Sequence, residues 1–301
     1  MTTKSPIRPD VTEAFVEAAD ATRLYLRCLN GRASVTALLC DGLVCDGFIY
    51  KYLWSDFPGG LGVAHWNYRG HGRSESPRDP ARVSVHDHAQ DLDRVRRHLG
   101  DPPVVLVGHS FGTQVALEAY RLRPAGVRGL VLVCGSFGRV THTFHGSELL
   151  ANVLPNLLAF AAQHPRLARA VWSRVPVRVA LKLAELTGDI DTTALNVDDL
   201  VPYFRHATHV DFQLFLKMLH WAGEHSAEDL LERVDVPVLV IAGARDSFTP
   251  PELSLAMSRA LPQGELFVVD DGSHVALLEH PDAIRARIET FLVERGITSI
   301  G

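Results

Sequence analysis

Short apolar runs, separated by longer segments, are the feature that most constrains the fold of this 301-residue chain. They are rich in valine and leucine and lack polar alternation, as expected of strands covered on both faces. Helical patterns separate them; Val85, Ala89, Leu92, Val95 and Leu99, for example, fall on one helical face. This alternation predicts an α/β fold with a mostly parallel, doubly wound sheet. The runs occupy residues 35–40, 62–66, 104–107, 128–134, 238–242 and 265–269.

One long interval, residues 136–226, contains no convincing strand pattern. Amphipathic helices are predicted there instead, separated by Pro165, Pro176, Gly188 and Pro202, at 149–162, 167–175, 179–186 and 212–221. Because strand-like runs resume afterwards, an inserted helical lid is favoured over an independent second domain. We therefore expect a core of residues 1–135 and 227–301 and a lid of residues 136–226. An antiparallel hairpin is predicted to open the core over 14–30, and a helix to close it over 281–295.

The composition excludes several classes of protein. The net charge of −5 provides no basic surface for nucleic acid, and no apolar stretch is long enough to span a membrane. Residues 1–10 are polar and contain proline, so no signal peptide is predicted. The four cysteines lack paired metal spacing, which predicts buried thiols in a reducing cytoplasm. The sequence leaves monomer and homodimer open.

The pentapeptide Gly108-His109-Ser110-Phe111-Gly112 lies between an apolar run and a helical pattern. A Gly-x-Ser-x-Gly at a strand-to-helix turn is typical of the nucleophile elbow of serine hydrolases. The flanking glycines let strand and helix approach closely, and the serine is forced into strained backbone angles. The pattern therefore predicts Ser110 as a nucleophile.

Two further polar residues follow strands in the C-terminal part of the chain. Asp246 comes directly after the run 238–242, and His274 follows the last run. A serine hydroxyl needs a base to take its proton, and the base needs an orienting acid. Because the carboxyl ends of parallel strands meet at one edge of a sheet, we expect Ser110, Asp246 and His274 to form a catalytic triad.

With these residues and their order, the chain resembles the α/β-hydrolase-fold serine hydrolases of the esterase and lipase type, over residues 13–295. The resemblance includes Asp271-Gly272-Ser273-His274 and the segment Asn67-Tyr68-Arg69-Gly70-His71-Gly72-Arg73-Ser74. In that family the segment 69–74 is mainly structural. The resemblance therefore implies no catalytic role for His71.

The oxyanion hole is also inferred from the resemblance. The backbone N–H groups of Phe111 and Leu43 are expected to hold the oxyanion. The family usually has histidine before the glycine of the second loop, whereas this chain has Asp41 before Gly42. A carboxylate there is unfavourable for an oxyanion unless it points away or is neutralised. We expect Asp41 to accept hydrogen bonds from nearby backbone donors.

The triad predicts hydrolysis of a carboxylic ester through an acyl-enzyme, with no metal or organic cofactor. The expected substrate is a small to medium apolar ester. The alternatives on the same triad are an acyltransferase, a lactonase or a carbon–carbon bond hydrolase. A ligand receptor that has kept the triad is a further, non-enzymatic alternative.

The lid carries apolar residues that are candidates for lining a substrate pocket. They are Phe144, Phe212 and Phe215, with Leu149 and Trp221 weighed beside them, and His109 is a further candidate contact next to the nucleophile. The histidine pairs lack the carboxylate or cysteine partners of a metal spacing, so no metal site is predicted from 86/88, 142/145 or 206/209.

Overall fold

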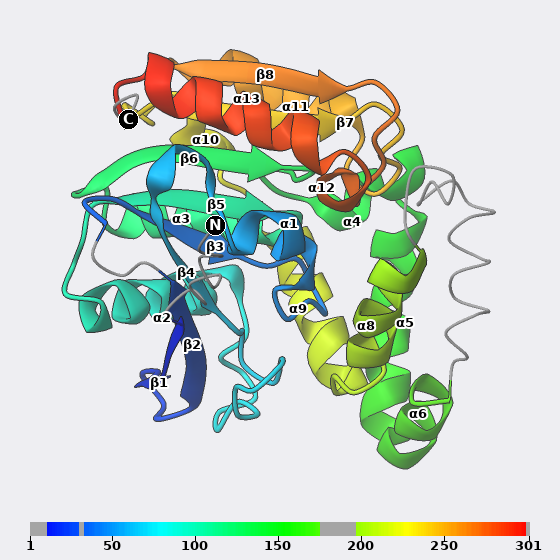
Figure 1. The fold of residues 1–301 in the computed structure, drawn as a ribbon. Coiled ribbons are helices and arrows are strands. Elements are labelled where there is room, and N and C mark those ends of the chain that lie inside the picture. Colours follow the sequence, from blue (N-terminus) through cyan, green and yellow to red (C-terminus); the bar gives the residue numbers. More distant parts are fainter. Residues whose placement is uncertain (1–10, 30–32, 175–196, 299–301) are drawn as a thin grey trace.

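The strand-forming segments build one eight-stranded sheet (Figure 1). The computed structural model describes residues 11–29, 33–174 and 197–298. The strand order is β1-β2-β4-β3-β5-β6-β7-β8. Pairings of β2 with β1 and β4 are antiparallel, and the others are parallel. The strands are β1 (Val11–Glu17), β2 (Arg23–Leu29), β3 (Thr36–Cys40), β4 (Gly62–Trp66), β5 (Val104–His109), β6 (Val127–Val133), β7 (Val238–Gly243) and β8 (Gly264–Val269).

The predicted fold class is confirmed, and each predicted apolar run coincides with a strand to within two residues at either end. The opening hairpin is formed by β1 and β2, with Ala21 in the left-handed region at its turn (φ 63°). Such a turn suits the local Asp20-Ala21-Thr22 sequence because the Asp20 carboxylate accepts the Thr22 backbone N–H.

Helices cover both faces of the sheet, because its strands are apolar on both sides. Side chains alternate between the faces, so Leu106 packs in one core layer while Val105 and Val107 pack in the other. One face carries α2 (Val85–His98), α3 (Phe111–Leu122), α10 (Glu228–Leu231) and α11 (Pro251–Ala260). The other carries η1 (Phe48–Tyr50), α1 (Lys51–Trp54), η2 (Pro58–Gly60), α12 (Ala276–Glu279) and α13 (Pro281–Glu294).

A helical insertion separates β6 from β7. Its described elements are α4 (Val140–Thr143), η3 (Phe144–Gly146), α5 (Leu149–Gln163), α6 (Pro165–Trp172), α8 (Val197–Ala207) and α9 (Phe212–Glu224). The arrowheads of β6 and β8 point toward the side of the sheet where these helices lie (Figure 1). The insertion therefore stands over the carboxyl ends of the strands, where catalytic loops of parallel sheets converge.

Helices were correctly expected in the insertion, and Pro165 separates α5 from α6 as predicted, but the boundary at Pro202 is wrong. Pro165 begins α6, where its missing N–H costs nothing, and Pro202 lies inside α8, which is not predicted. Buried Leu200 and Ala207 hold α8 by packing, which offsets one lost hydrogen bond. The expected helix at 179–186, together with Pro176, Gly188 and the end of 167–175, lies outside the described residues.

The two ends of the insertion meet at a narrow connection, which we call the neck (residues 137–139 and 225–227). Gly138 and Ser226 form an antiparallel bridge. Arg139 N–H donates to the His225 carbonyl at 2.9 Å, and Ala227 N–H donates to the Phe137 carbonyl at 2.8 Å. The predicted lid boundaries at 136 and 226 lie beside this neck, and that division stays a prediction.

Among the described helices, none combines the length and apolarity needed to cross a membrane. Cys28, Cys40, Cys45 and Cys134 are all buried free thiols. Burial raises the pKa of the Cys28 thiol to about 11, so this thiol is held in its unreactive protonated form.

Arg69 anchors the loop that follows β4. Its side chain is fully buried and binds Asp91 through Nε and Nη2, at 2.6 and 2.8 Å, and Asp20 through Nη1, at 2.8 Å. The Asp91 carboxylate is also buried, so water cannot take the place of the guanidinium as its hydrogen-bond donor.

Replacement of Arg69 by alanine is expected to lower the free energy of unfolding by about 3–5 kcal/mol, because Asp91 is left buried and unpaired. Urea denaturation followed by circular dichroism measures this change. The matched control is Arg73→Ala, whose pair with Glu13 is about half exposed on both sides and screened by water, so a much smaller loss of stability is expected. Equal effects of the two substitutions would contradict the anchoring role of Arg69.

Candidate active site

Ser110 lies at a sharp turn between β5 and α3. Its backbone has φ 53° and ψ −119°, an unusual conformation for a residue that is not glycine. A Cβ atom on Gly108 would overlap the Gly112 carbonyl, and one on Gly112 would overlap the Cys40 carbonyl. Glycine is therefore required at both positions, and the close approach that the sequence motif predicts is present. The strained backbone conformation of Ser110 is stabilised by its N–H, which donates to the Val133 carbonyl at 3.0 Å.

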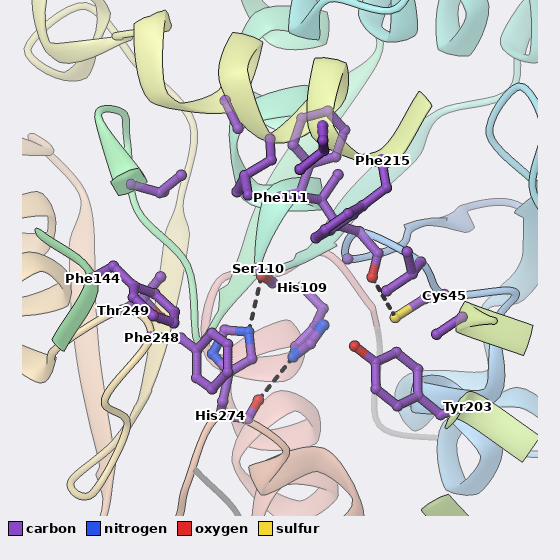
Figure 2. Close-up of a pocket in the computed structure, with 18 of the residues that line it drawn as sticks. Cys45, His109, Ser110, Phe111, Phe144, Tyr203, Phe215, Phe248, Thr249 and His274 are labelled. Carbon is purple, nitrogen blue, oxygen red and sulfur yellow. Dashed lines mark hydrogen bonds between the residues drawn. The ribbon is translucent and has the colours of Figure 1, made fainter. Parts of the chain in front are cut away.

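The structure brings the three predicted triad residues together. His274 Nε2 lies 2.9 Å from Ser110 Oγ, and His274 Nδ1 lies 2.9 and 3.1 Å from the two carboxylate oxygens of Asp246 (Figure 2 shows the serine contact). With Nδ1–H donating to the carboxylate, Nε2 carries the lone pair and can accept the serine proton. This geometry suits the removal of a proton from a serine hydroxyl.

Asp246 is buried and held as a carboxylate. Burial opposes its ionisation, but the charge and hydrogen bond of His274 outweigh burial and lower the Asp246 pKa. Phe248 N–H and Thr249 N–H each donate to Oδ1 at 2.9 Å, and the Thr249 hydroxyl donates to Oδ2 at 2.7 Å. These bonds fix the carboxylate plane, so Asp246 can fix the imidazole in turn.

The imidazole of His274 packs between two rings. Phe248 stacks on it with centroids 4.9 Å apart and planes 25° apart, and His109 lies beside it at 5.1 Å (Figure 2). His109 Nε2–H donates to the His274 carbonyl at 2.9 Å. Burial, followed by the charge of His274, lowers the His109 pKa to about 4, so His109 is a neutral neighbour at pH 7.

The two predicted oxyanion donors lie next to the nucleophile. Phe111 is the first residue of α3, so its N–H has no carbonyl four residues back within the helix. Leu43 and Gly42 border the same cavity as Ser110. The arrangement is compatible with two backbone donors aimed at one oxygen, and their role in binding an oxyanion stays a prediction.

Asp41 does not behave as expected from the sequence. Its carboxylate is fully buried, and Oδ2 accepts a hydrogen bond from the His65 imidazole Nε2 at 2.8 Å. The expected backbone donors are absent from the described hydrogen bonds of this carboxylate. The reason is topological. Strand β4 pairs with β3 so that His65 lies beside the end of β3, within hydrogen-bonding distance of the Asp41 carboxylate.

An apolar cavity of about 520 Å³ opens above Ser110. Its walls come from the loop after β3, from the elbow and from the insertion. All four predicted substrate contacts, His109, Phe144, Phe212 and Phe215, border it. Leu149 and Trp221 do not, because both side chains are exposed to solvent.

Other cavity residues are not predicted from the sequence. Phe248 lies two residues after Asp246, in a loop without a recognisable pattern, and joins Phe144 of the insertion to His274 through an edge-to-face contact with centroids 4.9 Å apart. Trp172 stacks on Phe215 with centroids 5.3 Å apart. Only the tertiary structure brings these aromatic residues together.

His71 is buried away from the cavity. Its Nδ1–H donates to the Arg69 carbonyl at 2.9 Å, and burial lowers its pKa to about 4. This location agrees with the structural role implied by the resemblance. Among the described residues, no group of three or more histidine, cysteine, aspartate or glutamate side chains is arranged to hold a metal ion.

Comparison with known proteins identifies relatives of this chain. A profile of the family "alpha/beta hydrolase fold" matches residues 56–281. The pimeloyl-[acyl-carrier protein] methyl ester esterase of Neisseria meningitidis serogroup B is 30% identical over 262 residues, which cover 86% of this chain and 93% of that esterase.

Solved structures agree with the fold. A thermophilic esterase from Thermogutta terrifontis superposes with a TM-score of 0.73 at 20% identity, over 94% of this chain and 99% of that one. An enol-lactonase from Burkholderia xenovorans superposes with a TM-score of 0.72 at 18% identity, over 93% and 99% of the two chains. At these identities the likeness supports the shared architecture alone.

Proposed function

This chain belongs to the α/β hydrolase fold family, and on that basis we propose that it is a carboxylic ester hydrolase with Ser110, His274 and Asp246 as its catalytic triad. The observation that carries the proposal is the continuous hydrogen-bonded path from Asp246 through His274 to Ser110, which ends at the floor of the apolar cavity. The esterase relative at 30% identity supports the reaction class.

The proposed reaction has two halves. His274 Nε2 takes the proton of Ser110 as Oγ attacks the ester carbonyl, and the N–H groups of Phe111 and Leu43 bind the oxyanion. His274 then protonates the leaving alcohol, and an acyl-enzyme remains. In the second half, His274 activates a water molecule that releases the acid. Asp246 keeps the imidazole oriented and offsets its positive charge in both halves.

We infer that the substrate is a small to medium apolar ester. Described cavity residues include no aspartate, glutamate, lysine or arginine. An ionised group on the substrate would lose its hydration there without gaining a partner, which is unfavourable. The insertion supplies most of the apolar wall, so we assign residues 136–226 the role of a lid that selects the substrate.

The test is a panel of p-nitrophenyl esters from acetate to laurate, with a matched anionic analogue. We expect the highest kcat/KM at short to medium acyl chains. Replacing the terminal methyl of p-nitrophenyl hexanoate by a carboxylate is expected to lower kcat/KM about 100-fold, since the cavity provides no cation. A carboxylate analogue that reacts as fast as the hexanoate would contradict the apolar substrate class.

Product analysis with an added alcohol separates hydrolysis from acyl transfer. Release of free acid in the presence of methanol supports a hydrolase, whereas formation of the methyl ester identifies an acyltransferase. Slow turnover of every ester and lactone tested would favour a ligand receptor.

A further inference from the structure

A second buried hydrogen-bonded path lies behind the loop that carries Leu43. It begins at Arg27 on β2, passes through His65 on β4 and ends at Asp41, directly after β3. Arg27 Nε–H donates to His65 Nδ1 at 3.2 Å, and His65 Nε2 lies 2.8 Å from Asp41 Oδ2. The side chains of His65 and Asp41 have no exposed surface.

The contact with Arg27 fixes the tautomer of His65. Because a guanidinium can only donate, Nδ1 must hold a lone pair. The proton of the neutral imidazole is therefore on Nε2, where it is donated to Asp41. One cation, one neutral imidazole and one carboxylate follow each other, so the three side chains together carry no net charge.

Arg27 is itself held in place. Its guanidinium lies over the Trp54 ring, 4.1 Å from the centroid, and the same ring meets His65 edge-on at 6.4 Å. A Cβ atom on Gly47 would lie within 3 Å of both Arg27 and His65, so the loop after β3 closes tightly over the pair. Among the described residues, the charged groups that face His65 are Arg27 and Asp41.

Asp41 is linked to the oxyanion loop through its backbone and through its charge. Asp41 immediately precedes Gly42 and Leu43, and its backbone carbonyl accepts the Tyr68 hydroxyl at 2.8 Å. Burial, followed by the negative charge of Asp41, raises the pKa of Tyr50 and Cys45 well above the usual range. An uncompensated carboxylate here would likewise oppose the negative charge of an oxyanion.

We propose that Arg27 and His65 are positioning residues for ester hydrolysis, which neutralise Asp41 and thereby hold the Gly42–Leu43 segment ready to bind the oxyanion. The inference rests on the proposed function, and it assigns a reason to the aspartate that stands where similar enzymes have histidine. Arg27 supplies the positive charge, and the neutral imidazole of His65 connects it to Asp41 through two hydrogen bonds.

Arg27→Met tests the proposal, because methionine keeps the contact with Trp54 but removes the cation. We expect kcat/KM for p-nitrophenyl butyrate to fall about tenfold, with most of the loss in kcat. A purely structural role of Arg27 would give a loss that is not relieved when the Asp41 carboxylate is removed as well.

The double variant Arg27→Met/Asp41→Asn removes both charges. We expect it to recover to within about threefold of the wild type. The control is Arg23→Met on the same strand, whose side chain is about half exposed, and which is expected to match the wild type. A double variant no better than Arg27→Met, or an Arg27→Met variant as active as the wild type, would overturn the proposal.

Nitrogen-15 NMR of the histidine rings gives a readout that needs no substrate. In the wild type we expect the His65 ring proton on Nε2 and a hydrogen-bonded lone pair on Nδ1, and in Arg27→Met a shifted Nδ1 resonance, because its donor is lost. An unchanged His65 in Arg27→Met overturns the proposal even if no ester is hydrolysed. A different result would contradict the proposed function, namely that the wild-type chain hydrolyses no ester of the panel.

Discussion

Replacement of Asp246 by asparagine is expected to lower kcat for ester hydrolysis by about 10⁴-fold. The side-chain amide can donate to His274 Nδ1, which stabilises the tautomer with its proton on Nε2. That proton would face Ser110 Oγ, which lies 2.9 Å away, and the imidazole could no longer accept the serine proton. Steady-state kinetics on the best ester of the panel measures the loss.

Asparagine nearly preserves the shape of the site, so this loss is chemical and not a folding defect. Thr249 and Phe248 still donate to the remaining oxygen at position 246. Asp271→Asn serves as the matched control, because that side chain is 79% exposed and lies outside the hydrogen-bonded path. An Asp246→Asn enzyme within tenfold of the wild type would show that His274 finds its orientation elsewhere.

The second large effect is expected for Ser110→Ala, which removes the nucleophile. We expect kcat to fall by about 10³-fold or more, with residual activity from the oxyanion donors and the cavity, which can still bind ester and attacking water. Mass spectrometry after incubation with a fluorophosphonate should find the adduct on Ser110 in the wild type and none in the variant.

The control for this substitution is Ser258→Ala on α11, whose hydroxyl bonds only to the Leu255 carbonyl of its own helix among the described contacts. Its activity should match that of the wild type. Ester hydrolysis that survives Ser110→Ala at a wild-type rate would mean that another group performs the attack, and the triad assignment would be wrong.

The parts of the fold that follow from local sequence are predictable. Buried parallel strands need continuous apolar runs, and the elbow needs glycine where backbones touch, so both are visible in the sequence. The meeting of Ser110, Asp246 and His274 is predictable as well. Each residue follows its own strand, and the carboxyl ends of parallel strands lie at one edge of the sheet. The structure accordingly has these elements where they are expected.

The parts that depend on contacts between distant segments are not predictable in this way. Asp41 finds its partner on a neighbouring strand, and the stack of Phe248 on His274 is set by a loop without a repeating pattern. Proline normally ends a helix, yet α8 continues through Pro202 because its apolar side packs against the rest of the protein. In each case tertiary packing outweighs the local signal.

The neck has a consequence for how such a chain can diversify. The polypeptide departs from the core at Phe137 and rejoins it at Ala227, and these two residues are hydrogen-bonded to each other. Whatever lies between them can lengthen, shorten or be exchanged without changing the alignment of β6 and β7. Evolution, or an engineer grafting a foreign segment at this junction, can therefore alter which molecules enter while leaving the bond-breaking apparatus untouched.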